Sequence, residues 1–198
     1  MKYLHFPLVA LLLFILVGCS DGNVVAVDEA SETPSTSTPM TTKSAPVGPM
    51  KTIPFKGRWE ARPDPEAPLI PCPDLNGNPT GVALPSKLIA QGQVTHLGRT
   101  RTVIRGEECW FNASEGTITA RGTATHTGAN GDAIRAEYQN VTSIEDGTFG
   151  SENIRFVGGT GRFEGVRGHA SSQGTINLNT FTASFSIEGR ITSVGASK

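Results

Sequence analysis

Four polar side chains could together line a site that donates and accepts protons near neutral pH: His96, His126, Tyr138 and Asn140. Each histidine continues the alternation of a strand-like segment, on the side of the small apolar residues, and stands beside a turn. On the segment that follows the Asn130-Gly131 turn, Tyr138 and Asn140 stand at alternate positions that also fall on the inward side. Histidine changes charge between about pH 5 and 8, and tyrosine and asparagine donate and accept hydrogen bonds. One interpretation is a proton-transfer site at the mouth of a barrel, formed by these four side chains.

A second interpretation needs no catalytic site. Histidines beside turns are commonly solvated, and a buried tyrosine or asparagine often hydrogen-bonds only to the backbone of a neighbouring strand. This arrangement is the more common of the two in folded proteins. The sequence therefore names His96, His126, Tyr138 and Asn140 as candidates and leaves a catalytic role unassigned.

Other reaction types lack the residues that they need. The sequence has no H-E-x-x-H, no G-x-S-x-G and no Cys/His cluster with the spacing of metal ligands. In the stretch "FVGGTGRFEGVRG", Glu164 stands where a dinucleotide fingerprint needs its third glycine, and Arg162 stands where a Walker loop needs lysine. We therefore expect no metal and no other cofactor. Positive and negative residues nearly balance, so we also expect no nucleic-acid partner.

The elements that must position these side chains are β-strands. In "TFTASFSIEGRI" (residues 180–191) apolar or small residues alternate with polar ones, which predicts a half-buried strand. Residues 116–126 and 87–96 repeat the alternation, with alanine and glycine at many inward positions. Small inward residues suit a strongly coiled sheet that closes on itself.

Turn signals divide the chain after residue 51 into eight strand-like runs, separated mostly by short connections. The sequence therefore predicts an all-β domain, an eight-stranded antiparallel up-and-down barrel, with an immunoglobulin-like sandwich as the alternative. The expected strands are 52–61, 87–97, 99–109, 116–126, 133–144, 148–157, 162–173 and 181–192.

The first residues have the pattern of an export signal. Lys2 precedes an apolar run over residues 6–17 that is shorter than the roughly 20 residues of a membrane span. The run ends in Leu16-Val17-Gly18-Cys19, which resembles the lipobox of bacterial lipoproteins. An ordinary signal peptide is the alternative. The resemblance implies a signal peptide over residues 1–18 and lipidation of Cys19, so that acyl chains anchor the protein in a membrane.

Residues 19–51 are rich in Ser, Thr and Pro and predict a disordered linker, with an r.m.s. reach of roughly 30 Å, before a domain over residues 52–198. Ser20 follows the cysteine, whereas aspartate there is the inner-membrane retention signal of enteric bacteria. The resemblance thus favours the outer membrane over the inner membrane of a bacterial envelope. In such an oxidising compartment, Cys72 and Cys109 most simply form one disulfide.

The glycine-rich stretch predicts a β-hairpin in which Phe163 points into the barrel. Its "GGTGRFEGVRG" resembles the G-G-T-G-x-F-x-G-A-x-G hairpin of the allene oxide cyclase and dirigent-like barrel families. Their catalytic residues lie outside this hairpin and find no residue-by-residue match in this sequence. The resemblance implies a barrel, a small hydrophobic ligand and a homo-oligomer. The motif residues are Gly158, Gly159, Gly161, Phe163, Gly165 and Gly168.

Gly57-Arg58-Trp59 resembles the shorter G-x-W motif of lipocalins, although Trp59 filling one barrel end is the simpler interpretation. We expect a non-catalytic, lipid-anchored envelope protein whose barrel binds a small apolar ligand or a partner protein. The alternatives are an isomerase or cyclase of the allene oxide cyclase type and a lipocalin-like carrier.

Overall fold

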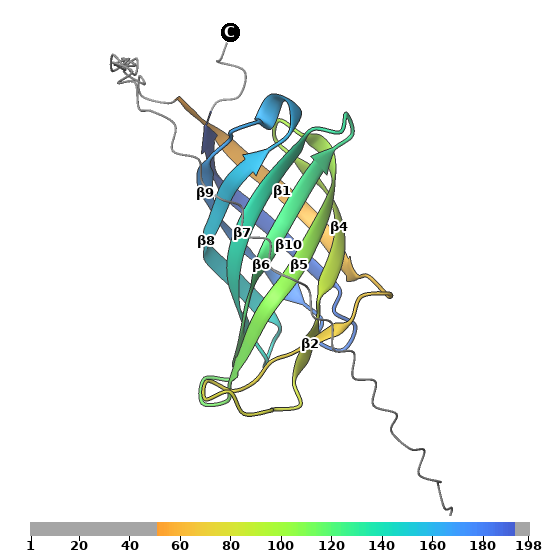
Figure 1. Cartoon of the computed structure of the whole chain (residues 1–198), viewed down its shortest axis with the longest axis vertical. Coiled ribbons are helices and arrows are strands. Elements are labelled where there is room, and N and C mark those ends of the chain that lie inside the picture. The colour runs from red at the N-terminus through yellow and green to blue at the C-terminus, as the bar shows by residue number, and fades with distance from the viewer. Residues whose placement is uncertain (1–50, 193–198) are drawn as a thin grey trace, which may run out of the picture. The chain divides into compact units, whose positions relative to one another are not determined.

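The computed structural model of the chain describes residues 51–192. The predicted signal peptide, Cys19 and linker lie outside these described residues. Within them there is no α-helix, and ten strands and one short 3-10 helix follow one another along the chain (Figure 1). The elements are β1 (Thr52–Pro63), β2 (Leu69–Pro71), β3 (Ala83–Pro85), β4 (Lys87–Val94), β5 (Gly98–Asn112), β6 (Thr117–Gly128), β7 (Ala133–Ser143), β8 (Thr148–Gly159), η1 (Gly161–Phe163), β9 (Gly168–Ile176) and β10 (Ala183–Thr192).

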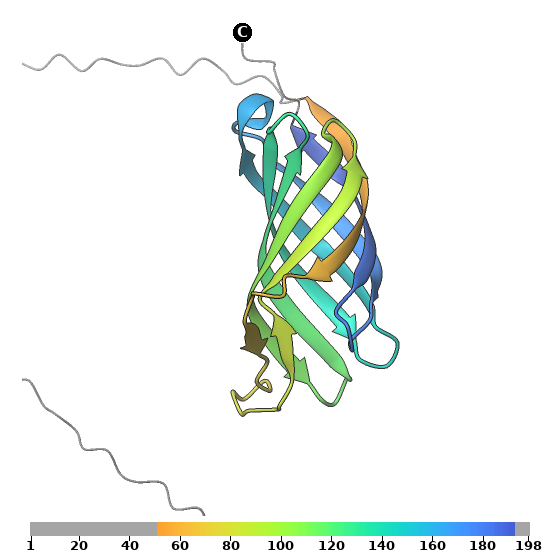
Figure 2. The ribbon, with the colours of Figure 1, turned by 90° about the vertical axis from the view of Figure 1, so that its right-hand side faces the viewer.

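Eight of the strands form a closed antiparallel barrel in the order β1-β10-β9-β8-β7-β6-β5-β4, with β4 paired back to β1. Strands β4 to β9 each pair with the next strand along the chain, and β10 pairs with β1, which is the up-and-down arrangement that the sequence predicts. The sandwich alternative is therefore wrong. Strands β2 and β3 form a separate hairpin within the one long connection, between β1 and β4, and lie at one end of the barrel (Figures 1 and 2).

The predicted alternation of inward and outward residues holds along the barrel strands. On β6, Ile118, Ala124 and His126 are buried and alternate with more exposed residues. On β10, the buried residues are Ala183, Ile187 and Ile191. Alternation of this kind places one face of every strand inside the barrel.

Aromatic side chains fill one half of the barrel interior. Phe55, Phe156 and Phe163 are fully buried there, and Trp59 is 1% exposed. The indole of Trp59 stacks on the ring of Phe185, its partner on β10, with 5.4 Å between the ring centroids. Gly92 lies opposite Trp59 on β4, where a Cβ would be 2.5 Å from the indole, so glycine leaves room for the ring. Trp59 therefore fills the barrel, as the simpler interpretation of Gly57-Arg58-Trp59 predicts.

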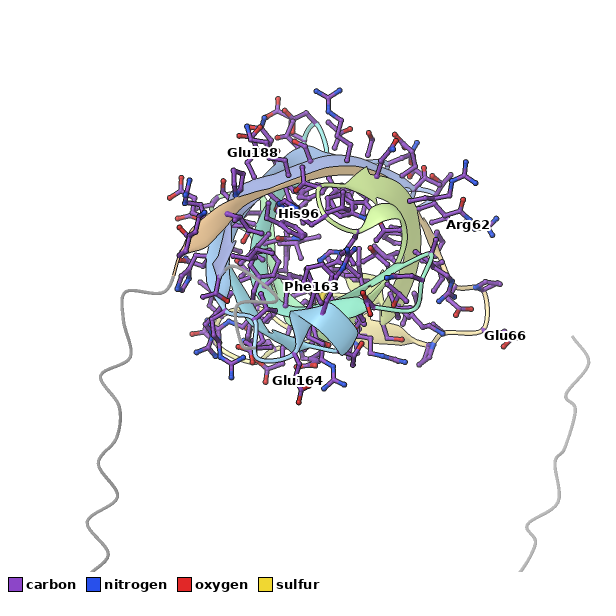
Figure 3. All side chains as sticks on the ribbon, turned by 90° about the horizontal axis from the view of Figure 1, so that it is seen from above. Arg62, Glu66, His96, Phe163, Glu164 and Glu188 are labelled. Atoms are coloured by element: carbon purple, nitrogen blue, oxygen red, sulfur yellow. A yellow bond between two sulfur atoms is a disulfide. The ribbon has the colours of Figure 1, made fainter. Side chains whose placement is uncertain are left out.

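The glycine-rich stretch differs from its prediction in one respect. The strand after it begins at Gly168 rather than at residue 162, because η1 and a following turn occupy residues 161–167. Phe163 enters the barrel from η1 and not from a strand. Figure 3 looks onto this end, where Phe163 lies inside the ring of strands and Glu164 lies outside.

Arg162 and Gly161 stabilise the end of the barrel at which Phe163 lies, and we call it the closed end. The guanidinium of Arg162 pairs with Asp132 at 3.1 Å and also donates to the carbonyl oxygen of His96, so three connections are joined. Gly161 has φ +60, and a Cβ there would overlap the Asp132 carboxylate. Both the backbone conformation and the space require glycine.

The predicted disulfide is present between Cys72 and Cys109, 37 residues apart in the chain. It joins the connection over residues 64–86 to β5 at the end opposite Phe163. Cys72, Cys109 and Ile118 form a second small core, against which Val82 and Leu84 pack. The connection is thus fixed across part of this end of the barrel.

Candidate ligand-binding cavity

The half of the barrel beneath the aromatic core is not completely filled by side chains. A cavity of about 120 Å³ lies there and opens toward the end that carries β2 and β3. Most of the lining side chains are apolar, and many are small. They include Ile70, Leu84, Pro85, Leu88, Ile104, Ile118, Ala120, Ala124, Ala136, Phe149, Ile154, Ile176, Ala183, Phe185 and Ile187.

The size and lining of the cavity fit a small apolar molecule. A dry cavity of about 150 Å³ lined by Leu, Ile and Phe is large enough to bind benzene. Ligand sites are generally apolar with a few polar groups that fix orientation. The polar side chains in this cavity wall are His126, Tyr138, Asn140, Thr142 and Ser172.

His126 lies at the inner end of the cavity, against the aromatic core. It is 1% exposed and packs on Trp59, with 5.2 Å between ring centroids, and on Phe55. Its Nδ1 lies 2.9 Å from Oγ1 of Thr102, which is fully buried and directly opposite on β5. Burial lowers the pKa of His126 to about 4, so the ring is neutral at pH 7.

Tyr138 lines the cavity nearer its open end. Its hydroxyl donates to the carbonyl oxygen of Arg105 at 3.3 Å, beside the point where an extra residue interrupts the β5–β6 register. Burial raises the pKa of Tyr138, and the nearby charge of Glu107 raises it further. The tyrosine therefore stays protonated at neutral pH, with a backbone carbonyl as its partner.

The three cavity-lining candidates lie at different depths. His126 on β6 lies opposite Ile134 on β7. Tyr138 is four residues beyond Ile134 on β7, so it lies about 13 Å along the strand from the level of His126. Asn140 is two residues beyond Tyr138. Efficient acid–base catalysis needs a pKa near the working pH, at atoms that converge on one bond. The pKa values of His126 and Tyr138 move away from neutrality in opposite directions. Concerted proton transfer by these groups is therefore not favoured.

His96 does not join the other three. Strand β4 ends at Val94, so the inward parity does not continue to His96, which adopts a left-handed turn with φ 68. Its side chain is exposed at the closed end, where Nε2 lies 3.0 Å from the carbonyl oxygen of Pro54. The expected mouth lined by all four side chains is not formed, because His96 lies at the opposite end from the opening.

Thr102 is the site residue that the sequence reasoning missed. Its parity with Ile104 on the same strand gives an inward position, but the pairing with His126 depends on the register between β5 and β6. Thr102 and His126 are polar residues at inward positions of two adjacent strands, and this pattern could have indicated a buried hydrogen bond between them. Within residues 51–192, no group of three or more His, Cys, Asp or Glu side chains is arranged to hold a metal ion. No helix in that range is long and apolar enough to cross a bilayer.

Comparison with known proteins gives distant structural neighbours. No family model and no curated protein matches the chain. Two of the solved structures that are similar to it are dirigent proteins. The pterocarpan synthase dirigent protein GePTS1 has 14% identity and a TM-score of 0.40, over 76% of this chain and 91% of its own. The pterocarpan synthase dirigent protein PsPTS1 has 16% identity and a TM-score of 0.39, over 72% and 95%. Both neighbours are dirigent proteins, but scores this low carry no inference about ligand or activity.

Proposed function

We propose that this protein is a non-catalytic binding protein that holds a small apolar molecule inside its barrel. The observation that carries the proposal is the cavity of about 120 Å³, walled mainly by apolar side chains and open at one end. Tightly packed barrels fill this space with their own side chains. Here alanines stand at facing positions on neighbouring strands, including Ala124 and Ala136, and leave the space empty.

Two features support binding over catalysis. The polar side chains of the cavity are spread along its length and do not converge on one point. His126 is neutral and Tyr138 protonated at neutral pH, so neither exchanges a proton readily there. A cyclase of the kind implied by the glycine-rich motif needs converging polar groups, and these residues do not supply them.

The proposal is tested by titrating the barrel domain with methylenecyclohexane, a small cyclic hydrocarbon, and following backbone amide resonances by NMR. We expect saturable shifts for residues of the cavity wall on β5, β6 and β7. An Ala124→Leu variant places added side-chain volume inside the cavity and should weaken binding at least tenfold. An absence of saturable binding to the wild-type domain would overturn the proposal.

Thr125→Leu is the matched control for this experiment. Thr125 is adjacent to Ala124 on β6 but points outward, so its substitution places a leucine side chain outside the barrel. We expect its affinity for methylenecyclohexane to equal that of the wild type. Equal weakening by both variants would show that the loss reflects general destabilisation and not occupation of the cavity.

We further propose that the barrel is held at the outer membrane of a bacterial envelope by lipid on Cys19. Support for this part comes from the sequence, in which Leu16-Val17-Gly18-Cys19 directly follows the apolar run. The disulfide between Cys72 and Cys109 is compatible with an exported, oxidising location. Anchoring and ligand binding are independent parts of the proposal and are tested separately.

A further inference from the structure

We propose that the cavity selects a ligand with one hydrogen-bond acceptor, a carbonyl or ether oxygen, which accepts from Nε2–H of His126. This inference rests on the proposed ligand-binding function and narrows the ligand class. The ligand would be a small, mainly apolar molecule that enters with its oxygen leading. Thr102 is a positioning residue in this arrangement, because it acts on the ligand only through the imidazole.

The first step is the tautomer of His126. Thr102 Oγ1 has one hydrogen-bond partner among the described residues, Nδ1 of His126 at 2.9 Å. If the threonine hydroxyl donates to Nδ1, the hydroxyl proton and the Nδ1 lone pair are both satisfied, and Nε2 carries the ring proton. The reverse arrangement leaves the threonine proton without an acceptor as well as Nε2 without a donor. Since buried polar groups are nearly always paired, the first arrangement is favoured.

The second step is the missing partner of Nε2. This nitrogen is buried and has no hydrogen-bond partner within residues 51–192. Its surroundings on the closed side are the rings of Trp59 and Phe55, which offer no oxygen acceptor. The histidine ring is also part of the cavity wall. An acceptor for the Nε2 proton can therefore come from a molecule inside the cavity.

The third step is access. Nε2 is covered by neighbouring side chains, so an oxygen atom reaches it only when the ring turns about its Cβ–Cγ bond. Torsions of this type are broad, which permits a modest rotation. The rotation also moves Nδ1, and the rotatable Thr102 hydroxyl must turn with it to keep its hydrogen bond. Space for the ring and for the ligand is available because the adjacent wall positions Ala124 and Ala136 are small.

The experiment compares two probes of nearly the same shape, cyclohexanone and methylenecyclohexane, on the wild-type domain and on His126→Phe. The ratio of their two dissociation constants, measured for each protein, removes the different hydration of the free probes. We expect the preference for the ketone to fall about fivefold in His126→Phe, the usual effect of one neutral hydrogen bond. His126 is part of the cavity wall, so this substitution can change the affinity for both probes, and a change common to both cancels in the ratio.

The outcomes separate this inference from the proposed function. If neither probe binds the wild-type domain, the proposed function fails and the inference fails with it. If both bind and the ratio is the same in the two proteins, only the inference is overturned, as when a bound water satisfies Nε2.

A measurement on the wild-type domain keeps the test independent of the variant's folding. The ¹⁵N resonances of the His126 ring should show a protonated Nε2 and an unprotonated Nδ1, with Nε2 shifting on addition of cyclohexanone. An unprotonated Nε2 would overturn the inference.

Discussion

At the scale of single residues, a histidine is an unusual choice for the interior of a barrel. His126 cannot become charged without losing hydration, and its pKa is lowered to about 4 because the site is buried. The unfolded chain would bind a proton at this position below about pH 6.5. Folding is therefore opposed by protonation as the pH falls, and the ring acts as a neutral hydrogen-bonding group at physiological pH.

This predicts a specific acid sensitivity of folding. Since the folded pKa lies below the unfolded one, the stability associated with neutral His126 is fully present above about pH 6.5 and is lost as the pH falls toward 4. Between pH 7.5 and 4.5 the wild type should lose about 2 to 3 kcal/mol more unfolding free energy than His126→Phe. Urea unfolding at the two pH values measures the difference.

Other titrating groups cancel in this comparison. The aspartates with lowered pKa, Asp64, Asp74 and Asp146, are common to both proteins. Equal losses in the two proteins would mean that His126 is already accessible to protons in the folded state.

At the scale of elements, the regular strands could be predicted and their ends could not. Alternation identified the interior face of β6 and β10 because one face of each strand is buried along its whole length. The same rule failed at His96, where the chain enters a left-handed turn, and at residues 162–167, where η1 precedes β9. Successive side chains point to opposite faces only while the backbone is extended, so the alternation cannot be continued past the end of a strand.

The cavity was beyond sequence reasoning for a related reason. Inward alanines and glycines indicate a small or empty interior, but which of them face one another depends on register. Extra residues interrupt the register between β5 and β6 and between β7 and β8. The pairing of Thr102 with His126 is fixed by that register, so the two residues could not be joined from the sequence.

The connection over residues 64–86 should depend on its disulfide. Replacing both Cys72 and Cys109 with serine removes a cross-link between residues 37 positions apart and should cost at most about 4 kcal/mol of unfolding free energy. Because Ile70, Leu84 and Pro85 form part of the cavity wall, affinity for methylenecyclohexane should also fall. Hydrogen exchange should become faster for amides of β2 and β3, while the amides of β6 and β7 remain protected.

Reduction of the wild-type disulfide is the matched comparison for this double variant. It should give the same local increase in exchange without introducing serine side chains. Unchanged protection of β2 and β3 in both preparations would mean that packing alone, through residues such as Val82 and Leu84, holds the connection in place.

At the scale of the whole molecule, the two halves of the barrel interior are packed differently. The half near Phe163 is filled by large buried aromatics, which supply much of the apolar burial that stabilises the fold. The other half is less completely packed and contains the cavity. His126 and Trp59 lie where the two halves meet, and each has one buried nitrogen without a partner among the described residues. A ligand at the inner end of the cavity therefore lies against the ring of His126, which is part of the cavity wall.

The last prediction concerns the anchor, which is independent of this interior. Cys19 precedes the barrel by about thirty residues of Ser, Thr and Pro-rich sequence, a composition that does not form a packed core. If Cys19 is lipidated, the full chain produced in a bacterium should partition into the detergent phase, and Cys19→Ala should partition into the aqueous phase, because each buried methylene of an acyl chain contributes about 0.8 kcal/mol. Both proteins should bind methylenecyclohexane equally, since the substitution leaves the cavity wall unchanged. Aqueous partitioning of the unsubstituted chain, with an intact mass that shows no acyl groups, would overturn the proposed lipid anchor.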